Sequence, residues 1–230
     1  MNKATTWWRD FRDLLSPRYC AICGKHLNPC EEKLCTSCLL QLPYLSIQDY
    51  LDNDVSRVFW GKLPVEQCSS FIRYGADDEI HRLVHQLKYR HRPDLGRWLG
   101  RQMALKLQRE GFFEGIECII PVPLHWRRRL KRGYNQSEQL ALGVSQITGL
   151  PVLTGYVRRV RNNKTQTHMS HSERIENVKD LFWVRRPIPH LHVLLIDDVI
   201  TTGATMLSFA ESIVASKPGV RISILSLAKT

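Results

Sequence analysis

Residues 192–207 read HVLLIDDVITTGATML, and this stretch decides the fold that the sequence predicts. The apolar run Val193–Ile196 is typical of a short buried strand in a parallel sheet, and we expect the strand to stop at the two aspartates that follow it. A loop rich in hydroxyl groups and glycine, Val199–Thr205, comes next, and Met206–Ser216 has the composition of a helix. The predicted order is therefore strand, acidic pair, loop and helix.

The loop has the chemistry of a phosphate site. A loop that opens a helix presents backbone N–H groups without intrahelical partners, and the helix dipole adds positive potential there. Gly203 allows a close approach of the chain, and the threonines add hydroxyl donors. The predicted phosphate contacts are Val199, Thr201, Thr202, Gly203, Ala204 and Thr205.

The acidic pair, Asp197 and Asp198, needs a separate explanation because carboxylates repel phosphate. Two carboxylates about one sugar length away from a bound phosphate can accept hydrogen bonds from vicinal ribose hydroxyls, or reach them through a divalent metal ion. The apolar run, Asp-Asp and Thr-Thr-Gly-x-Thr together resemble the signature of the type I phosphoribosyltransferases. That resemblance implies phosphoribosyl pyrophosphate (PRPP) bound with Mg²⁺, and Asp197 and Asp198 as catalytic residues. The alternative is a strand ending in solvated aspartates beside an ordinary capped helix.

Composition sets the broad class of the protein. The 230 residues suffice for one substantial domain with a small appendage. Lysine and arginine number 33 against 22 acidic residues, a net charge of +11, which favours phosphorylated metabolites, nucleic acid or an anionic membrane surface as partners without choosing among them. No apolar run approaches the roughly 18 residues of a membrane span, and the first residues are too charged for a signal peptide. We expect a cytoplasmic protein.

Four of the seven cysteines predict a structural zinc site. Cys20 and Cys23 form one C-x-x-C pair, and Cys35 and Cys38 form a second, separated from the first by eleven residues. Four thiolates complete a tetrahedral zinc shell and leave no position for a substrate, and zinc contributes on the order of 10 kcal/mol to folding such a module. Cys30 and His26 fall between the pairs, and either could replace a ligand. A redox dithiol is the alternative.

Three segments are expected along the chain. Residues 1–18 contain an amphipathic helix at Thr6–Leu15, which we expect to pack on its own domain or a partner, with membrane-surface binding as the alternative. Residues 19–64 form the zinc-ribbon module and a connector, and residues 65–230 form an α/β domain. Its strands are predicted at Glu66–Tyr74, Glu117–Val122 and Val220–Leu227, in βαβ units throughout the second half.

The most basic stretch, Trp126–Gln136, follows one of these strands and carries five cations within six residues. Ligands of open α/β sheets gather at the carboxyl ends of the strands, so these cations should face the same crevice as the acidic loop. Arginine donates two parallel hydrogen bonds and suits pyrophosphate. We predict pyrophosphate contacts from Arg128, Arg129 and Arg132, with a solvated or DNA-facing charge run as the alternative.

Two segments sharpen the resemblance to one family. PVPLHWRRRLKRGYNQSEQLA (121–141) and the stretch 160–178 resemble the ComF/GntX proteins, which pair an N-terminal zinc knuckle with a type I phosphoribosyltransferase-like domain. The resemblance implies a parallel sheet flanked by helices, and a role in competence: DNA uptake and transformation, or the use of extracellular DNA. The polar segment Arg158–Arg174 is expected to form a lid from which Lys164, a third predicted catalytic residue, closes over pyrophosphate.

Three functions stay open at this point. A phosphoribosyltransferase would displace pyrophosphate from ribose C1 by positioning its substrates, without a protein nucleophile. A non-catalytic protein would keep the fold and use the pocket for nucleotide sensing or for handling DNA, with single-stranded DNA as a partner. An adapter would dock a DNA-uptake ATPase or helicase through the zinc module. The sequence shows no segment that would recognise an acceptor.

Overall fold

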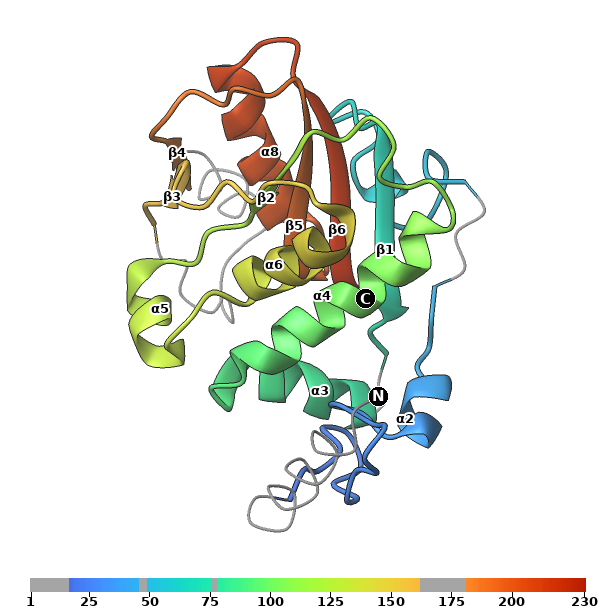
Figure 1. Cartoon of the computed structure of the whole chain (residues 1–230). Helices are drawn as coiled ribbons and strands as arrows, with labels where there is room; N and C mark the ends of the chain where they lie inside the picture. Colours follow the sequence, from blue (N-terminus) through green and yellow to red (C-terminus); the bar gives the residue numbers. More distant parts are fainter. Residues whose placement is uncertain (1–16, 46–48, 76–77, 162–180) are drawn as a thin grey trace.

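The computed structural model describes residues 17–45, 49–75, 78–161 and 181–230. These residues form a four-stranded parallel sheet in the order β1-β6-β5-β2 (Figure 1). The strands are β1 (Gln67–Arg73), β2 (Cys118–Pro121), β5 (His192–Ile200) and β6 (Arg221–Lys229). The predicted α/β fold, a parallel sheet flanked by helices, is confirmed. The predicted helix at residues 6–15 and the segment with Lys164 lie outside the described residues.

β5 is an interior strand, paired with β6 on one side and with β2 on the other. Val193 and Leu195 face one side of the sheet and Leu194 and Ile196 the other, and all four are fully buried. Burial on both faces is the reason that the strand is a continuous apolar run instead of an alternating one.

The expected end of this strand was wrong. β5 continues through both aspartates to Ile200, so that Val199 and Ile200 are strand residues and not part of the loop. The reason is that β6 is equally long and keeps pairing: Asp197 is opposite Ser226, and Ile200 is opposite Lys229. The acidic pair therefore lies within a hydrogen-bonded strand, which fixes its backbone.

Helices cover both faces of the sheet, as Figure 1 shows. The helices α4 and α6 share a core with Leu194 and Ile196, whereas α8 packs on Val193 and Leu195 through Phe209 and Ile213. The bounds are α3 (Asp78–Tyr89), α4 (Pro93–Gln108), α5 (Trp126–Arg132), α6 (Gln136–Thr148) and α8 (Ala204–Ser216). The helix expected at Met206–Ser216 is confirmed, and it begins two residues earlier.

An antiparallel hairpin interrupts the expected βαβ order of the second half. Its strands are β3 (Val157–Arg159) and β4 (Phe182–Val184), and Arg159 pairs with Phe182. Each strand has only three residues, too few for a readable hydrophobic pattern. Phe182 packs on Phe209 of α8 with ring centroids 5.0 Å apart, which anchors the hairpin beside the sheet (Figure 1).

The cysteine-rich module lies against α3 and α4, at the bottom of Figure 1. It contains the short helix α2 (Thr36–Leu40), and η1 (Ser56–Val58) follows in the connector. Ile22 and Leu34 of the module are buried in the same core as Leu83 and Leu87 of α3. Gln86 of α3 donates to the Ala21 carbonyl at 2.5 Å. The module thus extends the core of the larger domain.

Among the described residues, no helix combines the length and apolar character needed to cross a membrane.

Glycines allow α4 and α6 to touch. A Cβ at Gly100 would lie 2.1 Å from the Leu140 carbonyl oxygen, and one at Gly143 would lie 2.1 Å from the Arg97 carbonyl oxygen. Both distances are far below van der Waals contact, so only glycine fits at either position. The close approach brings the start of α6 to the carboxyl ends of β2 and β5, where Asn135 Nδ2 donates to the Val122 carbonyl at 3.0 Å.

We predict that Gly100→Ala destabilises the protein by about 1–3 kcal/mol, because overpacking outweighs the gain in helix propensity. Thermal unfolding measures the change. Gln108→Ala, an exposed substitution on the same helix, is the control and should leave the unfolding temperature nearly unchanged. A Gly100→Ala protein as stable as the wild type would show that the two helices can separate at little cost.

Candidate functional site

A pocket of about 160 Å³ lies at the carboxyl ends of β2 and β5. Several residues predicted from the sequence line it: Asp197, Asp198, Val199, Thr205, Arg128 and Arg132. Lining residues that the sequence analysis did not select include Lys88, Ser137 and Arg159. The pocket therefore joins segments that are far apart in the sequence, as expected for the crevice at the ends of parallel strands.

Asp197 is held in one orientation. Its Oδ1 accepts hydrogen bonds from Ser137 Oγ at 2.9 Å and from the backbone N–H of Asp198 at 2.8 Å. Burial, and then the charge of Asp198, raise the pKa of Asp197 to about 7. The two carboxylates are thus neighbours whose combined charge is costly without a cation or a hydrogen-bonding ligand.

Lys88 is the cation that the structure supplies to this pair. Its Nζ lies 3.3 Å from Asp198 Oδ2, and the Asp198 side chain is only 13% exposed. Lys88 comes from the last turn of α3, more than a hundred residues earlier in the chain. A basic residue near a helix end is common on protein surfaces, so nothing in the sequence distinguished this one.

The loop after β5 forms a second, smaller cavity of about 40 Å³, lined by Asp197 and by residues 199–206. It contains the predicted phosphate contacts Thr201, Thr202, Gly203, Ala204 and Thr205. Gly203 is the N-cap of α8 and has a φ of 73°. A Cβ there would lie 2.3 Å from Val58 Cγ1, so the conformation and the space both require glycine. The first N–H groups of α8 have no intrahelical partners and suit an anion.

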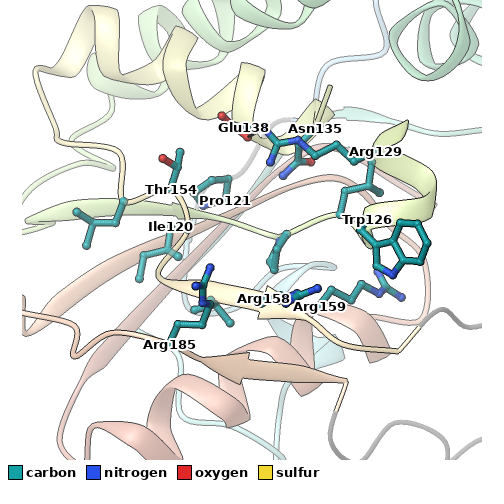
Figure 2. Close-up of a pocket in the computed structure, with 15 residues that line it drawn as sticks. Ile120, Pro121, Trp126, Arg129, Asn135, Glu138, Thr154, Arg158, Arg159 and Arg185 are labelled. Carbon is teal, nitrogen blue, oxygen red and sulfur yellow. Dashed lines mark ion pairs between the residues drawn. The ribbon is translucent and has the colours of Figure 1, made fainter. Parts of the chain in front are cut away.

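The basic stretch forms the helix α5, and its arginines divide between two cavities. Arg128 and Arg132, one helical turn apart, line the pocket with the aspartates. Arg132 also donates to Gln136 Oε1 at 2.9 Å and lies over the Tyr89 ring. Arg129 instead lines a neighbouring cavity, shown in Figure 2, where its guanidinium is 4.0 Å from a Glu138 carboxylate oxygen.

The pKa of His125 reflects its burial and the positive charge that surrounds it. It is the N-cap of α5, is buried, and accepts a hydrogen bond from the backbone N–H of Arg127. Burial, and then the charges of Arg127, Arg159, Arg128 and Arg158, lower the pKa of His125 below its ordinary value of 6.5. The imidazole is therefore neutral at physiological pH and remains available as an acceptor.

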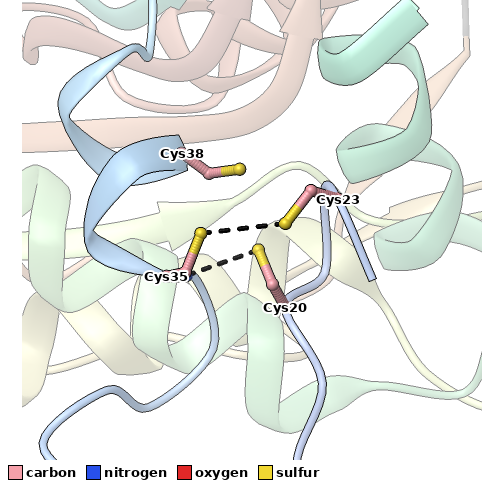
Figure 3. A group of neighbouring side chains, drawn as sticks. All are labelled: Cys20, Cys23, Cys35 and Cys38. Atoms are coloured by element: carbon pink, nitrogen blue, oxygen red, sulfur yellow. Dashed lines mark hydrogen bonds between the residues drawn. The ribbon is translucent and has the colours of Figure 1, made fainter. Parts of the chain in front are cut away.

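The four predicted zinc ligands converge. The sulfurs of Cys20, Cys23, Cys35 and Cys38 all lie within 4.8 Å of one another (Figure 3). Cys23 Sγ and Cys35 Sγ are 3.7 Å apart. Tetrahedral zinc with bonds of about 2.3 Å keeps its sulfurs about 3.8 Å apart, so the donor set fits this metal. Burial opposes ionisation of Cys20, but backbone N–H groups of Cys23, Cys35 and Ile22 outweigh it and lower its pKa to about 7.

Comparisons with known proteins give relatives but no matching family model. The chain is 30% identical over 195 residues to DNA utilization protein YhgH of Salmonella typhimurium, covering 84% of this chain and 82% of that protein. It is 30% identical over 194 residues to competence protein F of Haemophilus influenzae, covering 82% and 75% respectively. Competence protein ComFC of Bacillus subtilis is 25% identical over 112 residues, or 49% of this chain and 44% of that protein.

We predict that the wild-type protein binds about one zinc ion per chain, and that Cys35→Ser loses the metal and unfolds at a lower temperature. Elemental analysis and thermal unfolding measure both effects. Cys30→Ser is the matched control, because Cys30 is exposed and lies outside the four-sulfur cluster. Equal zinc contents in the two variants would contradict the assignment.

The raised pKa of Asp197 predicts that the contribution of this residue to the free energy of unfolding depends on pH. The folded-state pKa of about 7 exceeds the ordinary value of 3.8, so the folded protein holds this proton more tightly than the unfolded chain. The resulting stabilisation is fully present below the unfolded pKa and is lost as the pH rises through 7. Each pH unit between the two pKa values corresponds to about 1.4 kcal/mol.

Asp197→Asn lacks this dependence. Between about pH 5 and about pH 8, its free energy of unfolding relative to the wild type should therefore rise by more than about 1 kcal/mol, measured by urea unfolding without magnesium. A relative stability that stays constant or falls over this range would show that Asp197 ionises normally.

Proposed function

This chain belongs to the ComF family, which includes competence protein F and DNA utilization protein YhgH, and we propose that it binds PRPP with Mg²⁺ and acts as a phosphoribosyltransferase in the uptake or use of DNA. The names of the relatives support the biological process. The pocket supports the ligand.

One observation carries the proposed ligand: an acidic pair, a helix N-terminus and two arginines line two cavities that share Asp197, Val199 and Thr205 and so form one crevice. A phosphate alone would suit the N-terminus of α8 but would be repelled by Asp197 and Asp198. A sugar alone would need neither the loop nor the arginines. PRPP carries a 5′-phosphate, vicinal hydroxyls and a pyrophosphate, and the three groups match the three parts of the crevice.

Each part of the site then has a role. The N–H groups and hydroxyls at Thr201–Thr205 hold the 5′-phosphate, while Asp197 and Asp198 hold the ribose hydroxyls and the metal ion. Arg128 and Arg132 bind the pyrophosphate, because both line the same pocket as the aspartates. Arg129 lines the neighbouring cavity, and Lys164 lies outside the described residues, so neither carries the proposal.

The reaction needs no protein nucleophile. A group on the acceptor forms a bond to ribose C1 while the bond between C1 and the pyrophosphate oxygen breaks. Pyrophosphate leaves with the electron pair, and the proton of the attacking group passes to this departing anion. Mg²⁺, when bound, neutralises charge on the leaving group. The residues of this chain hold the two reactants in line, and Arg128 and Arg132 stabilise the charge that develops.

A second candidate function is contact with single-stranded DNA, and the exposed side of α5 favours it. Trp126, Arg127 and Lys131 are exposed there, and Arg127 lies over the Trp126 ring at 5.2 Å. Aromatic and basic side chains together bind single strands through base stacking and phosphate contacts. The predicted docking of a DNA-uptake ATPase or helicase on the zinc module stays a prediction.

Calorimetric titration of PRPP with Mg²⁺ tests the proposal. We expect the wild type to bind, and Asp197→Asn/Asp198→Asn to bind at least about tenfold more weakly, a loss of about 1.4 kcal/mol. Asp54→Asn, an exposed aspartate in the connector, is the control and should bind as the wild type does.

The salt dependence of ligand binding distinguishes the two candidate functions. Single-stranded DNA binding should weaken steeply with added salt through counterion release and should survive the Asp197→Asn/Asp198→Asn change. Absence of PRPP binding by the folded, zinc-loaded wild type would overturn the phosphoribosyltransferase proposal.

A further inference from the structure

The neighbouring cavity lined by Arg129 has a volume of about 340 Å³ and adjoins the proposed PRPP pocket. It lies between the end of β2, the helix α5 and the hairpin of β3 and β4, and Figure 2 shows its lining. The two spaces share Pro123, Leu124, Asn135 and Arg159 in their walls. Its volume falls in the range of small-molecule sites, about 300–1,000 Å³. A molecule in this cavity would be a direct neighbour of one in the PRPP pocket.

The lining of this cavity is strongly basic. Among the described residues that form it, four are arginines, whereas Glu138 is the carboxylate. Figure 2 shows Arg129 on one side of the cavity and Arg158, Arg159 and Arg185 on the other. Glu138 lies within 4.0 Å of Arg129. Within the described part of the chain, no carboxylate lies at ion-pair distance from the remaining three guanidinium groups.

Arg159 is the most informative of these residues because it is 9% exposed and lines both spaces. Its guanidinium lies over the Phe182 ring at 5.5 Å, and the described residues provide it with no hydrogen bond or ion pair. Burial, and then the charge of Arg128, lower its pKa, and the charge of Asp197 only partly offsets them. A buried cation that forms no direct ion pair is destabilised by its lost hydration, and an anionic ligand would offset that loss.

The cavity also offers flat apolar surface. Its lining residues include Trp126, Pro121, Pro123, Leu124 and Leu153, and Trp126 is 49% exposed. An exposed indole at the edge of a small-molecule cavity is a stacking surface for a planar ring. Thr154 adds a hydroxyl group that can donate or accept a hydrogen bond. The arginines and the apolar wall therefore select different parts of one ligand.

We propose that this cavity is the acceptor subsite of the reaction and that the acceptor is a planar nitrogen heterocycle carrying an acid group. The ring packs against Trp126 and the proline-rich wall, and the carboxylate or phosphate binds Arg158 and Arg185. Arg159 lies between the two spaces and contributes a positive charge to the wall of each. This inference rests on the proposed function of the adjoining pocket. It excludes an uncharged base as the preferred acceptor, because such a base would leave the arginines unpaired.

Two matched pairs of probes test the acid group. Orotate differs from uracil by one carboxylate, and uridine monophosphate differs from uridine by one phosphate. We expect saturable calorimetric binding of at least one acid, at least about tenfold tighter than its uncharged counterpart. The pair that shows the larger difference tells whether the cavity takes a carboxylate on the ring or a phosphate on an attached sugar.

Substitutions localise the binding. Arg158→Gln/Arg185→Gln should weaken the acid at least about tenfold and leave Mg²⁺-PRPP binding unchanged. Arg186→Gln is the matched control, because Arg186 is the next residue in the chain, lies over the Tyr156 ring and is not part of the cavity wall. Acid binding should also persist in Asp197→Asn.

Each failure has a distinct meaning. The inference is overturned if Mg²⁺-PRPP binds while neither acid does, if the uncharged probes bind equally well, or if the Arg158→Gln/Arg185→Gln protein retains full affinity for the acid. In these cases the proposed function stands. Acid binding in a wild type that does not bind PRPP would overturn the acceptor role together with the proposed function.

Discussion

The pairing of β5 between β6 and β2 is the constraint on which the candidate site depends. Because β6 continues to pair beyond the apolar run, Asp197 and Asp198 stand in a hydrogen-bonded strand with fixed backbones. The same parallel sheet directs the ends of β2 and β5 to one edge, where the loop before α8 and the basic helix α5 begin. A slip of one residue in this pairing would exchange the side chains between the two faces and bury the wrong carboxylate.

The site concentrates charge that the fold does not neutralise. Lys88 compensates Asp198, but the pKa of Asp197 is raised, and Arg159 is buried without an ion pair among the described residues. Charged groups of this kind reduce the stability of the free protein, and the proposed ligand would supply the counter-charges that they lack. The module with Cys20–Cys38 packs on α3 through Gln86, two residues before Lys88. A metal ion held by its four sulfurs would therefore stabilise the helix that supplies Lys88 to the site.

Local motifs could be predicted from the sequence, and long-range neighbours could not. The run Val193–Ile196, the loop ending at Thr205 and the cysteine pairs each carry their chemistry within a few residues. The structure has a buried strand over this run, a loop before α8 and the four-sulfur cluster, although the strand continues to Ile200 and shortens the expected loop. Lys88, Ser137 and Arg159 reach the pocket from other elements, and a single lysine, serine or arginine has no distinguishing pattern. The strands β3 and β4 have three residues each and are too short to show a periodic pattern, so the cavity between this hairpin and α5 could not be predicted.

Hydrogen exchange at the loop tests the central claim most directly, namely that the N–H groups at the start of α8 and the acidic pair bind one phosphoribosyl ligand. The exchange rates of the amides at 203–206 should fall when PRPP and Mg²⁺ are added, because the 5′-phosphate would accept their hydrogen bonds. Pyrophosphate with Mg²⁺ lacks that phosphate and should protect the loop far less. Equal protection by both ligands, or protection confined to α5, would contradict the account.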